Sequence, residues 1–476
     1  MNNDETPDDE LTGHEPSRSR RWKVAISSIL IVLVCSAPVV YRHWRLWHVP
    51  DIGHPFLVSE ILKQIPEEKN AFPIFASAFA LGKPVAETDF QQYMDEFLDD
   101  GWDSTDIQLN KYLEMNRPAL EKWQEATEKD DYQFVPIARI SDESDLTRIQ
   151  AHRNLVRWCQ VEIERLTKTG NPSGALVWLR ASFRCSGLMT RRASWMDRLW
   201  GESTFSISAH SAEKWMQQPG VTADELLELL AVIQATNELT EKPSNNTKVE
   251  YLISRQWYAK WSYDDRKNAY EKSHVDPPLR SRWEAWLLAE PEFSQRLIAH
   301  MTANHLAFVD DPRREHPPVL GDDFFDESVV CAAPVKCLPA RQLIDVLKDA
   351  KLINFDKRHL LSHFLESIDR GLARRACLQV AIAAQAYYRN RSKFPDRLAD
   401  LQPDYLSSLP VDPYAPRPIP VIYRRTEYGV VVYSRFTNEI DDGGTTITYD
   451  DAPRGNMPDF GIRIRTPHGG VAQTIP

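Results

Sequence analysis

The segment TKTGNPSGALVWLRASFRC, residues 167–185, decides the fold class of this chain. Gly170 is expected to end one helix, because glycine adopts the backbone conformation that closes helices, and Pro172 to begin the next. The residues that form one face of the first helix are three or four positions apart. They are Ile149, His152, Val156, Cys159, Ile163 and Leu166. The return face consists of Leu176, Leu179 and Phe183. This spacing predicts two antiparallel helices packed against each other.

Helical spacing of apolar residues extends over most of the chain, from residue 55 to about residue 370. The hairpin has no second copy at a fixed period, so residues 42–308 are predicted to form an irregular helical bundle or a short α-solenoid, with further helices over residues 339–372. Two helix starts are expected. Asn116 precedes a helix with Pro118 in its first turn, and Thr222 forms a capping box with Glu225.

The N-terminal region predicts a membrane anchor. Residues 1–21 are polar and acidic and are expected to be a disordered cytoplasmic tail. Residues 22–41 are predicted to be a transmembrane helix, because the uncharged stretch from Val24 to Tyr41 would span about 27 Å as a helix, close to the thickness of a bilayer core. Trp22 and Tyr41 stand at its two ends, where interfacial aromatic residues occur.

The flanking charges predict the orientation of this helix. Arg18, Arg20, Arg21 and Lys23 precede it, whereas Arg42 and Arg45 follow it closely. The positive-inside rule then favours a cytoplasmic N-terminus, with the bulk of the chain extracytoplasmic. A cleaved signal peptide is the alternative. We expect an uncleaved anchor, because a small-residue cleavage site ending at Ala37 would be followed directly by Pro38.

Catalytic signatures are mostly absent from the 476 residues, and the formal net charge of −11 with no basic stripe argues against a nucleic-acid partner. Fragments of a penicillin-binding enzyme pattern do occur, at Ser211-x-x-Lys214, Ser244-x-Asn246 and Lys168-Thr169-Gly170. We reject this pattern, because its last element should lie on a strand after the nucleophile and here ends a helix before it. No catalytic or cofactor-binding residue is therefore assigned.

The remaining features of the helical region are a loop and an aromatic segment. Residues 309–338 are acidic and interrupted by prolines, which predicts a surface loop or linker. Within it, Cys331 and Cys337 are predicted to form a disulfide in an oxidising compartment.

The stretch from Trp257 to Trp286 mixes Trp and Tyr with charged residues. We expect amphipathic helices with large core anchors there, with a ligand-binding aromatic surface as the alternative.

The chain changes character at LPVDPYAPRPIPVIYRRTEYGVVVYS, residues 409–434. Its prolines predict an extended, turning path, and two β-branched and aromatic runs separated by TEYG predict a β-hairpin. The apolar helix from Ala376 precedes it. Residues 373–444 resemble the C-terminal globular part of the type II secretion major pseudopilin, chiefly in the Leu-Pro-x-Asp-Pro-aromatic turn and the following Tyr-Ser strand. Residues 445–476 are expected to be an irregular tail.

The resemblance also implies a metal site. Pseudopilins hold calcium in the loop after the second strand, and NEIDDGG occupies that place here. Asn438, Asp441 and Asp442 provide the oxygen ligands that calcium prefers, and the two glycines that follow would allow the backbone carbonyls to turn inward. A simple acidic turn is the alternative.

The whole layout resembles a set of uncharacterised membrane-anchored helical proteins of planctomycete bacteria. This resemblance implies a bacterial origin, an anchor in the bacterial inner membrane and no particular activity. The sequence therefore predicts a mainly α protein with a transmembrane helix and a small C-terminal helix-plus-hairpin module. Its expected function is that of a non-catalytic interaction or scaffold protein of the envelope, with other envelope proteins as partners. The alternatives are an extracytoplasmic hydrolase with a dispersed site and a component of a secretion or pilus-like assembly.

Overall fold

The computed structural model describes residues 18–83, 102, 107–134, 142–260, 281–313, 338, 342–343, 346, 356–444 and 459–465. The α-helices are α1 (Arg18–His48), α2 (Val58–Ile61), α3 (Phe72–Leu81), α5 (Ile107–Thr127), α6 (Asp142–Lys168), α7 (Pro172–Leu188), α8 (Trp195–Met216), α9 (Ala223–Leu239), α10 (Pro243–Lys260), α12 (Arg282–Leu287), α13 (Glu292–Leu306) and α15 (Asp356–Arg391). The 3-10 helices are η1 (Glu67–Lys69), η4 (Leu398–Leu401) and η5 (Phe436–Asn438), and the strands are β1 (Ile422–Thr426), β2 (Gly429–Ser434) and β3 (Phe460–Arg465). The described chain is mainly helical with one small sheet.

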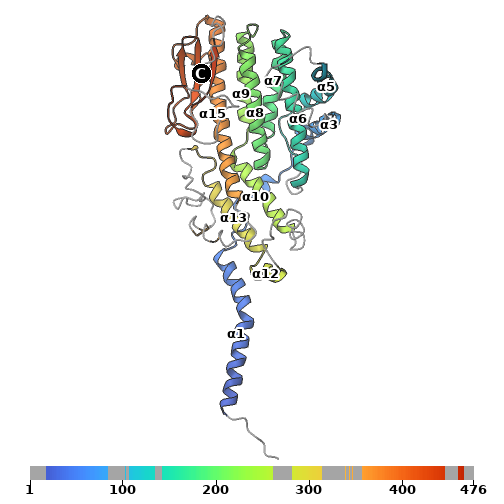
Figure 1. Cartoon of the computed structure of the whole chain (residues 1–476), viewed down its shortest axis with the longest axis vertical. Helices are drawn as coiled ribbons and strands as arrows, with labels where there is room; N and C mark the ends of the chain where they lie inside the picture. Colours follow the sequence, from blue (N-terminus) through green and yellow to red (C-terminus); the bar gives the residue numbers. More distant parts are fainter. Residues whose placement is uncertain are drawn as a thin grey trace, which may run out of the picture.

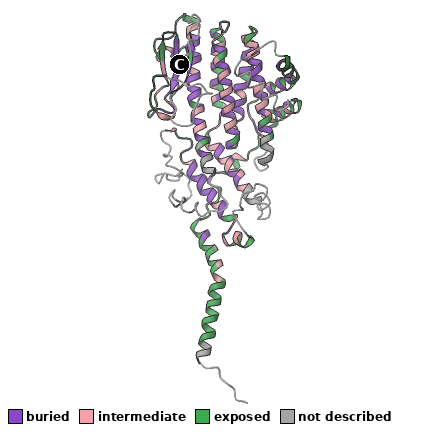
Figure 2. Cartoon of the chain, viewed as in Figure 1, coloured by how far each residue is buried: buried purple, intermediate pink, exposed green. Residues whose placement is uncertain are grey.

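The body is a layer of long helices. α6, α7, α8, α9 and α15 lie side by side, with α3 and α5 against α6 at one edge and the sheet against α15 at the other (Figure 1). Large side chains fill the space between them, among them the fully buried Trp123, Phe183, Phe205 and Trp215. A second apolar cluster at the base of the body joins α10 and α13 to the first part of α15 (Figure 2).

The helical hairpin predicted around Gly170 is confirmed. Gly170 has a φ of +79°, and the Asn171 side chain caps α7 by accepting a hydrogen bond from the Gly174 N–H at 2.9 Å. The predicted stripe on α6 faces the core, since Ile149, His152, Val156, Cys159 and Ile163 are all buried. The capping box at Thr222 is also present, with both of its hydrogen bonds formed.

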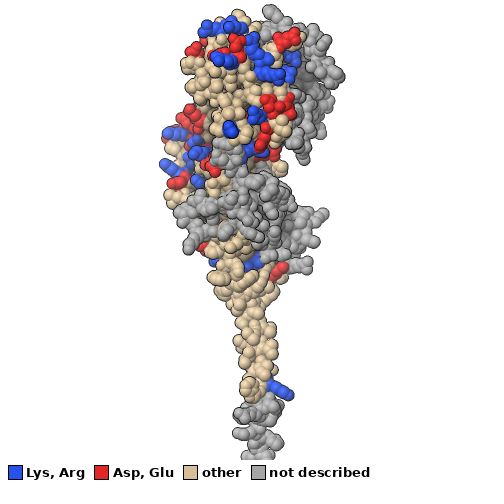
Figure 3. All heavy atoms as spheres, turned by 90° about the vertical axis from the view of Figure 1, so that its left-hand side faces the viewer, with Lys and Arg blue, Asp and Glu red and all other residues tan. Residues whose placement is uncertain are grey.

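α1 leaves the body as a stalk (Figure 1). Its segment Trp22–His48 is long and apolar enough to cross a membrane, and none of its most apolar window is buried. On the face seen in Figure 3 the stalk carries no charge between the base of the body and a basic residue near its start. The length and the exposed apolar surface of α1 are those of a helix that could span a bilayer.

The sheet is antiparallel in the order β1-β2-β3. β2 lies in the centre and all of its residues are buried. The predicted hairpin joins Thr426 to Gly429. A Cβ atom at Gly429 would lie 1.9 Å from the carbonyl oxygen of Ile464, so only glycine allows β3 to approach this turn.

Several expectations need correction. The tail from residue 445 is not irregular throughout, because residues 460–465 form β3 and pair with β2. α15 runs through the expected module boundary at residue 373 without a break. Asn116 does not begin a helix. It lies buried inside α5, where its Oδ1 accepts the Lys83 N–H at 2.9 Å and its Nδ2 donates to the Tyr112 carbonyl.

The tryptophans of α12 are also not core anchors. Trp283 is 58% exposed and Trp286 is 38% exposed. Their ring centroids are 4.9 Å apart and the rings are stacked. The remainder of the aromatic segment, residues 261–280, lies outside the described residues.

Candidate functional site

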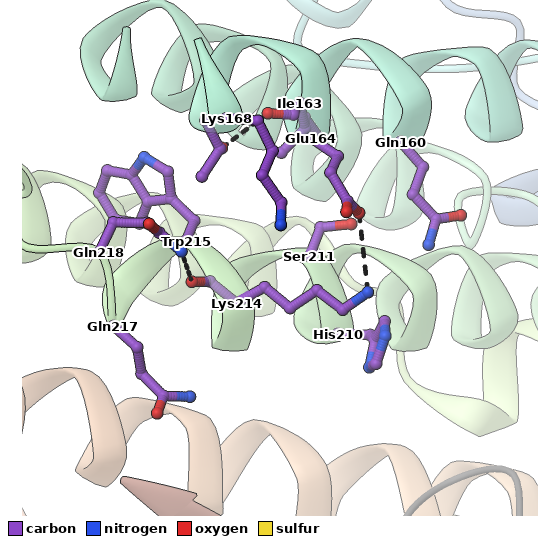
Figure 4. A pocket seen from close by; sticks show the side chains of 11 residues that line it. Gln160, Ile163, Glu164, Lys168, His210, Ser211, Lys214, Trp215, Gln217 and Gln218 are labelled. Carbon is purple, nitrogen blue, oxygen red and sulfur yellow. Dashed lines mark hydrogen bonds and ion pairs between the residues drawn. The ribbon is translucent and has the colours of Figure 1, made fainter. Parts of the chain in front are cut away.

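A polar groove of about 370 Å³ opens between α6 and the second half of α8 (Figure 4). Two helices that pack side by side leave a furrow wherever the facing side chains are polar or flexible, and both helices supply such residues here. The lining from α6 is Gln160, Ile163, Glu164, Thr167 and Lys168. The lining from α8 is His210, Ser211, Lys214 and Trp215, and the two residues that follow α8, Gln217 and Gln218, complete it. The i, i+3, i+4 and i+7 spacing within each set places its members on one face of the helix.

The groove is organised around one ion pair. Lys214 lies along the groove, and its Nζ is 3.6 Å from Oε2 of Glu164 (Figure 4). Glu164 is also held by the Trp102 N–H, which donates to Oε1 at 3.2 Å. The Glu164 side chain is 12% exposed and that of Lys214 is 43% exposed. The ammonium group of Lys214 can therefore still donate hydrogen bonds to a ligand. The same is true of Lys168, which is exposed on the opposite wall.

The groove brings together residues of the rejected enzyme pattern, but not in a catalytic arrangement. The Ser211 hydroxyl donates to the Ile207 carbonyl within its own helix at 3.3 Å, and Lys214 pairs with Glu164 and not with Ser211. Backbone N–H groups inside a helix bond within it, so those of α6 and α8 that border the groove are not available to stabilise an oxyanion. Asn246 lies elsewhere, at α10, where it binds the carbonyls of Thr190 and Ala193.

α15 fixes the end of α8 that carries the groove. The last carbonyl groups of a helix have no partners within it. Here Gln385 donates to the Met216 carbonyl at 3.2 Å, and Arg389 donates to the Gln218 carbonyl at 2.6 Å. The Trp215 indole N–H donates to the Pro172 carbonyl at 2.9 Å and so ties the floor of the groove to α7. The groove is therefore a rigid feature of three packed helices.

These contacts describe a binding surface with both charges, amide groups and an aromatic floor. No protein family, curated protein or solved structure matches this chain. The chemistry of the groove therefore rests on its own side chains. With two lysines and one glutamate, it favours a polar ligand that carries a carboxylate or another acidic group.

The first half of α8 carries a second group of charged residues. We call it the closed network, because its members are buried and pair with one another. Glu202 accepts hydrogen bonds from Arg198 at 2.9 Å and from Arg375 of α15 at 2.6 Å. Arg198 also donates to the Glu241 carbonyl at 2.5 Å. Burial opposes ionisation of Glu202, but Arg375 and Arg198 together hold its pKa below the usual value. A Cβ atom at Gly371 would lie 2.2 Å from Oε2 of Glu202, so this glycine allows α15 to approach the network.

The predicted calcium loop lies beside the sheet. The Asn438 side chain donates to Oδ2 of Asp442 at 2.7 Å, and Oδ1 of Asp441 accepts the Tyr433 hydroxyl at 3.0 Å. Among the described residues, no three or more His, Cys, Asp or Glu side chains are grouped to hold a metal ion. Asp459, which is buried beside this loop, was not predicted. Its Oδ2 accepts the Gly444 N–H, whereas its Oδ1 has no hydrogen-bond partner in the described structure.

The predicted disulfide cysteines, Cys331 and Cys337, lie outside the described residues. Of the cysteines in the described part, Cys159, Cys185 and Cys377 are buried and free.

The groove itself was not predicted. The signal was a polar face on α6, at Gln160, Glu164 and Lys168, which flanks the apolar stripe and which is common to most surface helices.

Proposed function

We propose that this chain is a single-pass, membrane-anchored protein of the bacterial envelope, whose helical body lies outside the cytoplasm and binds a partner without catalysis. The observation that carries the binding role is the arrangement of the groove. Lys214 and Lys168 are accessible there, while Ser211 is engaged by its own helix. Such a site offers charge and hydrogen bonds but no activated nucleophile.

Two features support the anchor and its orientation. The apolar part of α1 is exposed along its length, and basic residues are concentrated before Val24. Retention of the N-terminal charges on the cytoplasmic side would place the body outside. The partner would then be another envelope protein that presents an acidic segment to the groove.

Reporter fusions after Pro476 test the location of the body. A reporter that is active only outside the cytoplasm should be active there, and one that is active only inside should be silent. The opposite pattern would contradict the orientation and the envelope assignment together.

Purification of the native protein from membranes tests the binding role. We expect that Lys214→Glu loses a partner that the wild type retains, because the substitution reverses the charge presented by the groove. The matched control is Lys242→Glu, at an exposed position before α10. Identical partner sets for wild type and Lys214→Glu would contradict the proposal.

A further inference from the structure

The stalk is joined to the base of the body by a set of arginine contacts. Arg42 donates to the Trp286 carbonyl at the end of α12, and Arg45 donates to the Leu288 carbonyl at 3.1 Å. The Arg45 guanidinium also lies 3.9 Å from the centre of the Phe293 ring. In the reverse direction, Arg296 of α13 donates to the Leu46 and Val49 carbonyls at 3.0 and 3.1 Å. The end of α1 is thus clamped to the body and is not a flexible tether.

These contacts set the depth of α12 relative to a bilayer. The uncharged stretch of α1 from Val24 spans about 27 Å, so its far end matches the edge of a hydrocarbon core about 30 Å thick. Arg42 is the first charged residue beyond that edge. Because Arg42 binds the backbone of Trp286, α12 lies at the level of the lipid headgroups once α1 spans the membrane.

The side chains exposed at this level are those that suit an interface. Trp44 is 51% exposed and Trp47 is 77% exposed on the last turns of α1. Trp283 and Trp286 add an exposed stacked pair on the neighbouring α12. Tryptophan combines a large apolar ring with one polar N–H group, and it is therefore enriched where hydrocarbon meets water.

We propose that α12 is a second membrane contact, in which Trp283 and Trp286 insert into the headgroup layer of the bilayer beside Trp44 and Trp47. The proposal rests on the proposed function, because it requires α1 to span the membrane. Together with the arginine clamp, this contact holds the body in one orientation. α8 has 22 residues and is about 33 Å long, and its start at Trp195 packs in the apolar cluster at the base of the body. The groove lies toward the other end of α8 and is therefore far from the membrane.

The test uses the full chain in phosphatidylcholine nanodiscs whose lipids carry bromine near the headgroup, a short-range quencher of Trp fluorescence. The wild type is compared with W283F/W286F, with W44F/W47F as a positive control and W200F, in the body, as a negative control. We expect W283F/W286F to lower the quenched part of the emission by roughly two fifths, since it removes two of about five interfacial tryptophans. W200F should leave it unchanged.

The outcomes separate the two proposals. Unchanged quenching in W283F/W286F, with reduced quenching in W44F/W47F, would overturn the role of α12 and leave the anchor intact. Failure of the wild type to insert, with no quenching in any variant, would contradict the anchor itself. A second measurement needs no substitution. Photoactivatable phosphatidylcholine should label the peptide containing residues 282–287 in the wild type, and labelling of α1 without α12 would overturn the inference.

Discussion

The two halves of α8 carry similar residues in opposite settings. In the first half, the Arg198 and Glu202 side chains are 2% and 5% exposed, and partners from α15 and from the segment after α9 surround them. In the second half, Lys214 is 43% exposed and its ion pair with Glu164 closes only one side. The number of partners around a charge, and not the presence of the charge, therefore separates a structural role from a binding role.

Removal of one member of the closed network should have the largest effect on stability. Glu202→Ala leaves Arg198 and Arg375 buried without their counter-charge, which should lower the free energy of unfolding by about 3–5 kcal/mol. Denaturant unfolding measures this change. The matched control is Glu228→Ala on the exposed face of α9, where we expect a change within about 0.5 kcal/mol. Equal losses in the two variants would break the distinction between closed and open charges.

Burial also predicts an effect of pH on stability at His305, whose side chain lies inside the body on α13. Burial lowers the pKa of His305 to about 4. Its value in the unfolded chain is about 6.5, so the folded state binds fewer protons, and stability is lost as the pH falls from about 6.5 to about 4, by up to roughly 3 kcal/mol. His305→Gln should abolish this part of the acid sensitivity.

Urea unfolding at several pH values measures the effect of His305→Gln. The difference in stability between wild type and variant should narrow as the pH falls through this window. A difference that stays constant across this window would contradict the prediction.

A smaller effect is expected in the C-terminal module, where Asp412 connects the proline-rich turn to β2. Its Oδ1 accepts the Tyr414 N–H at 3.0 Å and the Ser434 hydroxyl at 2.6 Å, and its Oδ2 accepts the Arg435 N–H at 3.1 Å. Asp412→Ala leaves these buried donors without a partner and should cost about 2–3 kcal/mol.

Thermal or denaturant unfolding tests the role of Asp412. Asp404→Ala, at an exposed position nearby, is the control and should be near neutral. If Asp412→Ala also proves neutral, the carboxylate does not connect the turn to the strand.

Calcium should have a still smaller effect, through the loop at residues 438–444. If Asn438, Asp441 and Asp442 bind calcium, the ion stabilises the folded chain by about 1.4 kcal/mol at ten times its dissociation constant. Thermal unfolding of the full chain in millimolar-scale calcium measures this, and Asp441→Ala should remove the shift. A wild-type melting curve unchanged by calcium would leave only an acidic turn.

The features that were predicted correctly depend only on residues close together in the sequence. Gly170 and Pro172 marked a helix boundary by backbone chemistry alone, and Thr222 with Glu225 marked a cap. The prediction at Asn116 was wrong because the cue of a polar residue before a proline is also satisfied inside a helix, where Asn116 binds Lys83 and Tyr112. β3 was missed although Ile462 and Ile464 alternate with arginines, because a strand of six residues forms only when a partner such as β2 is present.

The site depended on tertiary contacts and was therefore harder to predict. Lys214 and Glu164 are 50 positions apart, and nothing local indicates that they meet. Arg374 and Arg375 lie 168 and 173 positions from Ser206 and Glu202, their partners on α8, and these contacts could be identified only in the folded chain. The sequence around the exposed tryptophans of α12 is of the same kind as that around buried tryptophans. Only the packing in the folded chain distinguishes the two.

The ion pair of the groove should contribute little to stability, because Lys214 is 43% exposed and Glu164 would keep its hydrogen bond from the Trp102 N–H. Lys214→Ala should therefore change the free energy of unfolding by less than about 1 kcal/mol. Chemical denaturation measures this change. A loss as large as that for Glu202→Ala would make Lys214 a structural residue and would remove the contrast between the two halves of α8.

The most direct test of the binding role is photo-cross-linking from within the groove in native membranes. A photoreactive phenylalanine analogue at Gln217 should yield a discrete cross-linked species, which disappears when Lys214→Glu is added. The same analogue at exposed Glu228 of α9 should yield no such species. If Gln217 gives no adduct, or gives one that Lys214→Glu leaves intact, the groove is not the binding site.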